Sequence, residues 1–363
     1  MAGESIPCTR NGKPDRREVA RLLRESLQSP SPESVEPRQD ELLAVVCDAI
    51  ADVAGHAVVE PGRSIRDLGI DSLDLLRLAI ELENRVARPV RLVDVLEGGS
   101  AAAIAGRIAE DIDREDADLV NLQPGSSSRS RTLYCVPGVG GTVFSFQSIL
   151  DGLPSWLPVQ GLPYPGTAGR VDPLKRVELI GKRFAERILA EGGPPIAILG
   201  YSLGGFVAFE AARTLLDHGV GCPIIVIDSA PAGLPSRRSF AARVTSAKDW
   251  KMRFRNVLPD GIINRLGGGG NKAIQSLRGV VAAGFEAMRF YAPEPAPIDV
   301  VLVRTTETDF GPVADQFDLG WSTLADTVDV IEIPTAHLEV FRGGSMDLAR
   351  AVRFVVERRR DEG

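Results

Sequence analysis

From residue 131 onward, short apolar runs alternate with stretches whose apolar residues recur at helical spacing. This alternation is typical of a mostly parallel β-sheet, because parallel strands need long crossover connections that usually contain a helix. The sequence therefore predicts one α/β domain over residues 131–363. The expected strands are the runs 132–137 (TLYCVP), 159–164 (VQGLPY), 196–201 (IAILGY), 224–228 (IIVID), 299–304 (DVVLVR) and 329–334 (DVIEIP).

A Gly-x-Ser-x-Gly sequence, Gly200 to Gly204, follows the third of these runs and precedes the helical run 206–218 (FVAFEAARTLLDH). At a strand-to-helix turn, this motif places its serine on a sharp elbow, and glycines are needed because side chains would clash with the neighbouring strand and helix. The string alone is a weak signal, and an incidental serine in a tight turn is the alternative interpretation. The flanking strand and helix favour Ser202 as a nucleophile.

A serine needs a neighbouring base to act as a nucleophile at neutral pH, and the chain has only three histidines. His56 lies in a different part of the chain, and His218 ends the helix that Ser202 begins. His337, which follows the last expected strand, is therefore the predicted base. The order serine, acid, histidine is that of α/β-hydrolases.

The acid that orients the histidine is predicted to be Asp228, which ends an apolar strand 26 residues after Ser202. Glu307 and Asp309, after the next strand, remain rivals, because many α/β-hydrolases carry the acid there. The oxyanion donors are expected to be two backbone amides. Leu203 supplies the first, and Val139, or alternatively Gly140, supplies the second from the loop after the first strand.

About 70 residues separate Asp228 from the next strand, and such a long insertion above an active site usually acts as a lid. The lid is predicted over residues 234–290. Aromatic and methionine residues of this insertion are candidates either for lining an acyl channel or for packing within the lid itself. They are Phe240, Trp250, Met252, Phe254, Phe285, Met288 and Tyr291.

The segment 38–114 has a different character, with amphipathic helices and 15 acidic against 9 basic residues. Ser72 precedes a helix whose expected buried stripe is Leu75, Leu78, Ala79, Leu82 and Val86. An ordinary N-cap is the plain interpretation of this serine. A phosphoester is the alternative, because a helix N-terminus attracts phosphate. Residues 1–37 and 115–130 are polar and are predicted to be a tail and a flexible linker.

The overall composition excludes several classes of protein. The 42 basic and 49 acidic residues give a net charge of −7, so nucleic acid is not an expected partner. No apolar run is long enough for a membrane helix, and the first residues lack the apolar core of a secretory signal. Four scattered cysteines indicate free thiols in a reducing cytoplasm, with neither a disulfide framework nor a metal site.

Three segments together carry a family resemblance. Residues 67–85 (DLGIDSLDLLRLAIELENR) resemble the modification site of an acyl or peptidyl carrier protein, in which the serine of Asp-Ser-Leu bears 4'-phosphopantetheine. Residues 131–363 resemble the terminal type I thioesterase of nonribosomal peptide and polyketide synthases, through GYSLGG, the acid after IIVID, LGWSTL (319–324) and AHLEVF (336–341). Residues 6–18 resemble the closing lysine motif of an adenylation domain, with Lys13 in the lysine's place.

The resemblance implies a small all-α four-helix carrier bundle followed by an α/β-hydrolase domain with a helical lid. It implies a 4'-phosphopantetheine on Ser72, upstream synthetase domains or modules, a phosphopantetheinyl transferase as a partner, and an acyl or peptidyl substrate tethered as a thioester. The Gly-Ile-Asp-Ser sequence is closer to polyketide-type carriers than to most peptidyl carriers.

The predicted function is the release of a carrier-bound acyl or peptidyl thioester through an acyl-enzyme on Ser202, by hydrolysis or cyclisation. Three alternatives stay open. The first is a stand-alone serine esterase with a helical interaction module. The second is a carrier platform whose hydrolase half is inactive, and the third is an enzyme that releases its product by condensation. The intact serine, acid and histidine disfavour the inactive platform.

Overall fold

The computed structural model describes residues 39–56, 58–68, 70, 72–86, 90, 94–95, 98–110, 119–126, 131–167, 171–193, 195–231, 272–307 and 316–361. Several predictions lie outside these residues. They are the N-terminal segment with Lys13, most of the lid (residues 234–271) and the rival acid Asp309. No helix among the described residues is long and apolar enough to cross a membrane.

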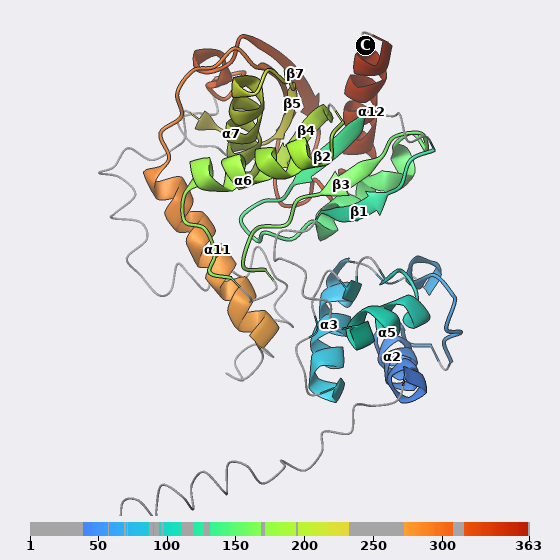
Figure 1. Ribbon diagram of the computed structural model, residues 1–363. Coiled ribbons are helices and arrows are strands. Elements are labelled where there is room, and N and C mark those ends of the chain that lie inside the picture. Colours follow the sequence, from blue (N-terminus) through green and yellow to red (C-terminus); the bar gives the residue numbers. More distant parts are fainter. Residues whose placement is uncertain are drawn as a thin grey trace, which may run out of the picture. The chain divides into compact units, whose positions relative to one another are not determined.

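The N-terminal part of the described chain is helical (Figure 1). It contains α2 (Gln39–Ala54), the 3-10 turn η1 (Ile65–Leu68), α3 (Ser72–Val86) and α5 (Ala101–Glu110). The predicted stripe of α3 is confirmed, since Leu75, Leu78, Ala79 and Leu82 are buried and Val86 is partly buried against the same core. The fourth helix of the expected bundle stays a prediction, because residues 87–89, 91–93 and 96–97 are not described.

The C-terminal part is built on a seven-stranded sheet in the order β1-β3-β2-β4-β5-β6-β7 (Figure 1). All six predicted strands are present, and every pairing among them is parallel. They are β2 (Thr132–Val136), β3 (Val159–Gly161), β4 (Pro195–Tyr201), β5 (Ile224–Ile227), β6 (Asp299–Thr305) and β7 (Thr327–Ile333). The mostly parallel sheet with helices fits the predicted α/β-hydrolase fold.

The strand β1 (Val120–Gln123) corrects the prediction of a linker over residues 115–130. It pairs antiparallel with β3 at the edge of the sheet, with Val120 and Leu122 buried and Asn121 exposed. Its two apolar residues, alternating with polar ones in a polar stretch, are too weak a pattern to identify from the sequence. Residues 120–123 therefore belong to the hydrolase sheet.

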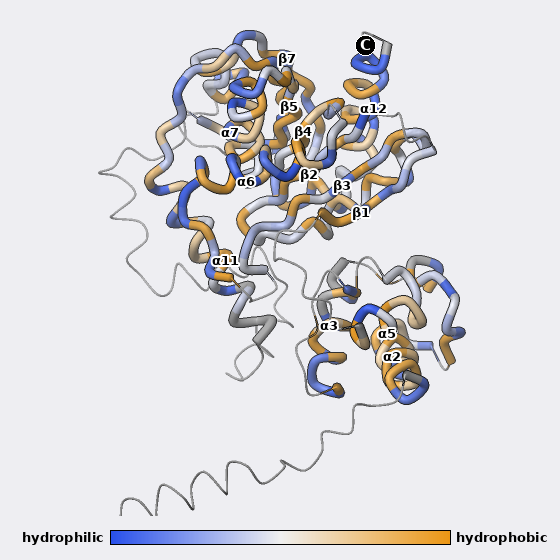
Figure 2. The backbone as a smooth tube through the Cα atoms, in the orientation of Figure 1, coloured by the Kyte–Doolittle hydropathy of each residue, from blue (hydrophilic) through white to orange (hydrophobic). Residues whose placement is uncertain are grey.

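Helices cover both faces of the sheet, and each face has its own apolar core. On one face, α6 (Val177–Ala190), α7 (Leu203–Asp217) and α11 (Lys272–Phe290) pack against Tyr134, Ile198 and Val226. On the other, the 3-10 segment η2 (Phe144–Gly152) and α12 (Ser345–Asp361) pack against Leu199, Ile225 and Val303. The central strands are strongly hydrophobic (Figure 2), as burial on both faces requires.

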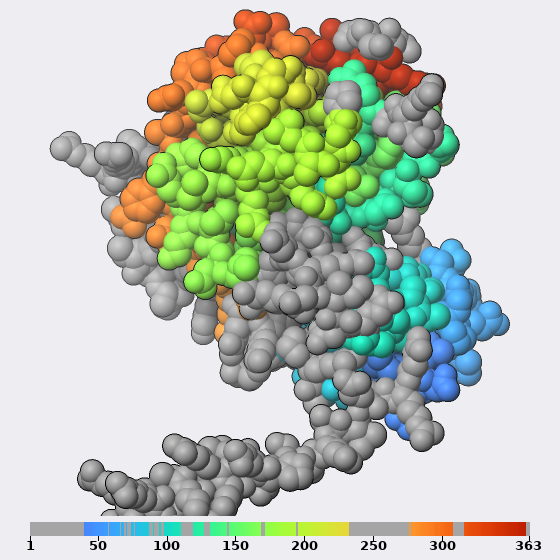
Figure 3. Space-filling model, viewed as in Figure 1, coloured from blue at the N-terminus to red at the C-terminus, as the bar shows by residue number. Residues whose placement is uncertain are grey.

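α6 and α7 adjoin on the surface of this domain (Figure 3). Their close approach depends on a glycine, because a Cβ at Gly181 of α6 would lie 2.5 Å from Glu210 Cβ of α7. The helix that follows the predicted nucleophile is thus held tightly against its neighbour.

Three of the four cysteines lie within the described residues, and all three are free thiols. Cys135 and Cys222 are buried in the hydrolase domain, and Cys47 is half-buried in α2. Burial raises the pKa of Cys222 to about 12, raises that of Cys135 further, and raises that of Cys47. These thiols are protonated at neutral pH.

Candidate active site

Ser202 occupies the turn between β4 and α7, as the motif predicts. Its backbone has φ 54° and ψ −118°, a conformation that residues with a Cβ rarely adopt. The turn is held by hydrogen bonds from the Ser202 amide to the Ile227 carbonyl (2.9 Å) and from the Ser229 hydroxyl to the Ser202 carbonyl. Such strain persists only where the surroundings enforce it, and it is typical of functional sites.

The glycines of the motif are required by close backbone contacts. A Cβ on Gly200 would lie 2.3 Å from the Gly204 carbonyl oxygen. A Cβ on Gly204 would lie 2.3 Å from the Val136 carbonyl oxygen, at the end of β2. Both obstacles are backbone atoms that cannot rotate away, so the elbow admits no side chain at either position.

Asp228 follows β5, the strand next to β4, and its side chain is fully buried. It also has a positive φ, 50°. Among the described residues, the only other non-glycine residues with positive φ are Ser202 and Leu319. Two of these three strained positions are therefore predicted catalytic residues.

The carboxylate of Asp228 is held by the last residue of β6. The Thr305 amide donates to Asp228 Oδ1 (2.7 Å), and the Thr305 hydroxyl donates to Oδ2. Thr305 is a supporting residue that the sequence reasoning missed, because a threonine at a strand end carries no distinctive signal. The rival acid Glu307 is exposed two residues farther on.

His337 lies in the segment between β7 and α12, and its Nδ1 is 3.2 Å from Asp228 Oδ2. The two residues are 109 positions apart in the chain. They meet because parallel strands present their carboxyl ends at one edge of the sheet. In the strand order, β5 lies next to β4, and one strand, β6, separates β5 from β7. A carboxylate on Nδ1 leaves Nε2 of the imidazole as the proton acceptor.

The other two histidines contact nearby carbonyls within their own parts of the described chain. His218 Nδ1 lies 2.8 Å from the Thr214 carbonyl at the end of α7, and His56 Nε2 lies 3.3 Å from the Leu68 carbonyl in the N-terminal domain. Neither contact involves the elbow, in keeping with their exclusion as the base.

The predicted oxyanion donors lie beside the elbow. Leu203 is the first residue of α7, where an amide has no partner within the helix. Val139 lies in the turn after β2, which is closed by the hydrogen bond from the Gly141 amide to the Gly138 carbonyl (2.9 Å). Among the described residues, no acceptor is found for the amide of Leu203 or Val139. Two free donors near Ser202 suit a developing oxyanion.

Helix α11, the described part of the predicted lid, packs directly on these donors. A Cβ on Gly284 would lie 2.9 Å from Val139 Cγ2 and 3.0 Å from Leu203 Cδ2. A Cβ on Gly141 would likewise lie 2.5 Å from Val280 Cγ1 of α11. The helix therefore packs closely against the loop that carries Val139 and Gly141.

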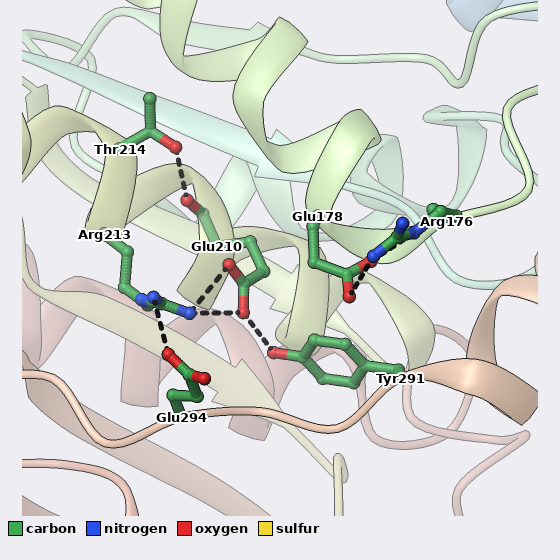
Figure 4. Close-up of polar contacts among 7 residues, drawn as sticks. All are labelled: Arg176, Glu178, Glu210, Arg213, Thr214, Tyr291 and Glu294. Carbon is green, nitrogen blue, oxygen red and sulfur yellow. Dashed lines mark hydrogen bonds and ion pairs between the residues drawn. The ribbon is translucent and has the colours of Figure 1, made fainter.

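The C-terminal end of α11 is anchored to α7 by a polar cluster (Figure 4). The Tyr291 hydroxyl donates to Glu210 Oε1 (2.9 Å), and Arg213 Nη1 donates to both carboxylate oxygens (3.1 Å each). Arg213 also pairs with Glu294 (3.6 Å). Tyr291, a candidate for the acyl channel, is instead buried in this core.

Replacing Tyr291 with phenylalanine is expected to lower the free energy of unfolding by about 1.5–3 kcal/mol at pH 7, because a buried hydrogen bond to a charged group is lost. Burial raises the pKa of Glu210 above 4.5, and the Tyr291 hydrogen bond lowers it. The folded state thus holds the proton more tightly, and stability falls as pH rises through the folded-state pKa. Without the hydroxyl that pKa rises further, so the loss should be smaller at pH 4 than at pH 7.

Urea unfolding of both proteins at the two pH values measures this difference. Tyr164→Phe is the matched control, since the Tyr164 hydroxyl donates to the neutral Pro137 carbonyl (2.8 Å). Its penalty should not depend on pH over this range. An equal penalty for Tyr291→Phe at pH 4 and pH 7 would contradict the assignment of the bond to the charged carboxylate.

In the N-terminal domain, Ser72 is the first residue of α3, a helix of 15 residues. The free amides and the dipole of a helix N-terminus bind phosphate, so a phosphodiester at this position fits the local backbone. Leu68 and Ile70, which precede it in the chain, are buried in the helical core.

Comparisons with known proteins agree with this organisation. Residues 44–108 match the family model for the phosphopantetheine attachment site, and residues 131–255 match that for the thioesterase domain. Indigoidine synthase from Streptomyces lavendulae is 25% identical over 221 residues, which cover 60% of this chain and 17% of that protein.

Solved structures share the fold. A four-domain nonribosomal peptide synthetase, holo-AB3403 bound to AMP and glycine, aligns with a TM-score of 0.55 and 20% identity, over 96% of this chain and 28% of the synthetase. The type II thioesterase BorB from the borrelidin biosynthetic cluster aligns with a TM-score of 0.53 and 16% identity, over 68% of this chain and 98% of that protein. With the two domain matches in this order, the chain is a carrier protein–thioesterase didomain.

Proposed function

We propose that this chain releases an acyl or peptidyl group, held as a thioester on its own carrier domain, by covalent catalysis at Ser202. The carrier domain spans residues 38–114 and the hydrolase domain begins at β1. The observation that carries the proposal is the 3.2 Å contact between His337 Nδ1 and the buried Asp228 carboxylate, beside the strained elbow of Ser202.

The carrier domain supplies a thiol for the acyl group, through 4'-phosphopantetheine bound to the Ser72 hydroxyl. A phosphopantetheinyl transferase installs this group, and upstream synthetase modules provide the acyl chain. Ser72 is the proposed attachment residue because it begins α3 within the matched attachment domain.

In the first half of the reaction, Ser202 Oγ attacks the thioester carbonyl carbon while its proton passes to His337 Nε2. Asp228 holds the imidazole through Nδ1 and stabilises its cation. The amides of Leu203 and Val139 stabilise the tetrahedral oxyanion. When the carbon–sulfur bond breaks, the imidazolium gives its proton to the leaving thiolate, and an ester on Ser202 remains.

In the second half, His337 Nε2 takes a proton from an attacking water, or from a nucleophile within the acyl chain. The new tetrahedral oxyanion collapses, the ester bond breaks, and Ser202 Oγ recovers its proton from the imidazolium. Water gives a free acid, and an internal nucleophile gives a cyclic product. This route needs only protein groups and the substrate.

Intact-mass analysis tests the proposal. The parent protein and Ser72→Ala are treated with octanoyl-coenzyme A and a phosphopantetheinyl transferase. The transferase moves the octanoyl-phosphopantetheine arm from coenzyme A to the carrier serine in one step. The parent should gain the mass of the acyl-phosphopantetheine arm and then lose the acyl mass with time as octanoic acid appears. Ser72→Ala should gain nothing, and an equal gain in both proteins would contradict attachment at Ser72.

A further inference from the structure

His337 lies beside an aromatic cluster of Tyr201, Phe341 and Phe146. The proposed mechanism does not use this cluster. Tyr201 is the last residue of β4, while Phe341 lies four residues after His337. The rings of Tyr201 and Phe341 meet edge to face at 5.0 Å, and Phe341 meets Phe146 of η2 in the same way at 5.1 Å. The Tyr201 ring is therefore packed against Phe341 as well as against the imidazole.

Tyr201 contacts His337 at two separate points. Its ring is stacked on the imidazole, with centroids 4.8 Å apart and an interplanar angle of 27°. Its hydroxyl donates to the main-chain carbonyl of His337 at 2.9 Å. One contact fixes the plane of the imidazole and the other fixes the backbone that carries it.

These contacts matter because His337 lies outside any helix or strand, in the turns between β7 and α12. Regular structure therefore does not set its position. Tyr201, in contrast, ends a buried central strand and is bonded directly to Ser202. A residue that touches the base and adjoins the nucleophile fixes the distance between them.

We propose that Tyr201 is a positioning residue that holds the imidazole of His337 against Ser202 and stabilises the protonated imidazole during the reaction. The inference rests on the proposed function of this site. An aromatic face attracts a cation, so the stacked ring favours the imidazolium that forms when Ser202 loses its proton. Misplacement of such a base by about an ångström slows a reaction strongly.

The hydroxyl of Tyr201 acts only as a donor in this arrangement. Burial, and secondarily the charge of Asp228, raise the pKa of Tyr201 well above its usual value of 10. The phenol is therefore protonated at neutral pH, and its hydroxyl donates to the His337 carbonyl.

Three variants of the full chain separate the two contacts. Tyr201→Phe removes the hydroxyl and keeps the stacked ring, whereas Tyr201→Leu removes both. Phe341→Leu is the matched control, because it removes an aromatic ring from the same cluster without removing the contacts of Tyr201 with His337. Thermal unfolding of all three shows how much of any change is structural.

The readout is the rate of labelling by a fluorophosphonate probe, which reacts with activated serines whatever their acyl substrate, measured from pH 5 to 9. Tyr201→Leu should react about tenfold more slowly, and the acid limb of its pH profile should move to lower pH by about half a unit. Tyr201→Phe should react a few-fold more slowly with an unmoved acid limb. Phe341→Leu should keep the parent's acid limb.

A Tyr201→Leu protein that reacts within twofold of the parent, or whose acid limb does not move to lower pH, would overturn the proposal. An equal shift of the acid limb to lower pH in Phe341→Leu would also overturn the proposal. If Tyr201→Leu does not fold, an unchanged rate in Tyr201→Phe has the same force. Failure of the proposed function looks different. In that case the parent itself would resist the probe, or the Ser202→Ala variant would be labelled as well as the parent.

Discussion

A Ser202→Ala variant carrying an octanoyl thioester on its carrier domain is expected to discharge it at least about 10⁴-fold more slowly than the parent. The variant loses the only atom that forms the acyl ester. Its fold should persist, because alanine meets the same backbone strain as serine. The bonds from the Ser202 amide to Ile227 and from Ser229 to the Ser202 carbonyl also involve backbone atoms of residue 202. Intact-mass measurements over time report the thioester directly.

Ser148→Ala is the matched control for this experiment. Ser148 is also a serine of the hydrolase domain, with an exposed hydroxyl that donates to the Ser145 carbonyl (2.8 Å). It should discharge its thioester at the parent's rate. A Ser202→Ala protein that releases octanoic acid as fast as the parent would rule out covalent catalysis at the elbow.

Asp228→Asn is expected to lower the rate of release by roughly 10³–10⁴-fold with little change in fold. The carboxamide oxygen can still accept from the Thr305 amide, which donates to Oδ1 at 2.7 Å. The NH₂ group then replaces Oδ2, the atom that faces His337 Nδ1. A donor at that position favours the imidazole with its proton on Nε2, which cannot accept the Ser202 proton.

The same experiment decides between Asp228 and Glu307, one of its two rivals after β6. Glu307→Gln, at an exposed carboxylate beyond Thr305, should leave release within about twofold of the parent. Both variants should unfold at a similar temperature to the parent. A large loss in Glu307→Gln with near-normal release in Asp228→Asn would reverse the assignment of the acid.

The sheet and the placement of Ser202, Asp228 and His337 at the ends of strands were predictable because strong local signals encode them. Continuous apolar runs identify strands that are buried on both faces, and all six such runs form strands of the sheet. Glycines around Ser202 identify an elbow because no other residue fits there. With only three histidines in the chain, elimination then leads to His337, which the structure brings against Asp228.

The residues that support the site were not predictable from the sequence. Thr305 acts through its hydroxyl and amide on a carboxylate 77 positions away, and Tyr201 acts on a histidine 136 positions away. Thr305 meets Asp228 through the pairing of β6 with β5, and Tyr201 at the end of β4 meets a residue in the turns after β7. No local pattern specifies either contact. β1 was missed for a related reason, since a short edge strand gains its stability from its partner and not from its own apolar residues.

The buried, protonated cysteines Cys135 and Cys222 affect whether the acyl group can be lost to a competing thiol before it reaches Ser202. A thioester exchanges readily with any exposed thiolate, and only the thiolate form is nucleophilic. Cys135 and Cys222 are enclosed by the hydrolase core, and the pKa of Cys222 is raised to about 12. Neither thiol can therefore take the acyl group before it is transferred to the proposed acceptor, the Ser202 hydroxyl. For the same reason, a maleimide applied at neutral pH should spare these two side chains.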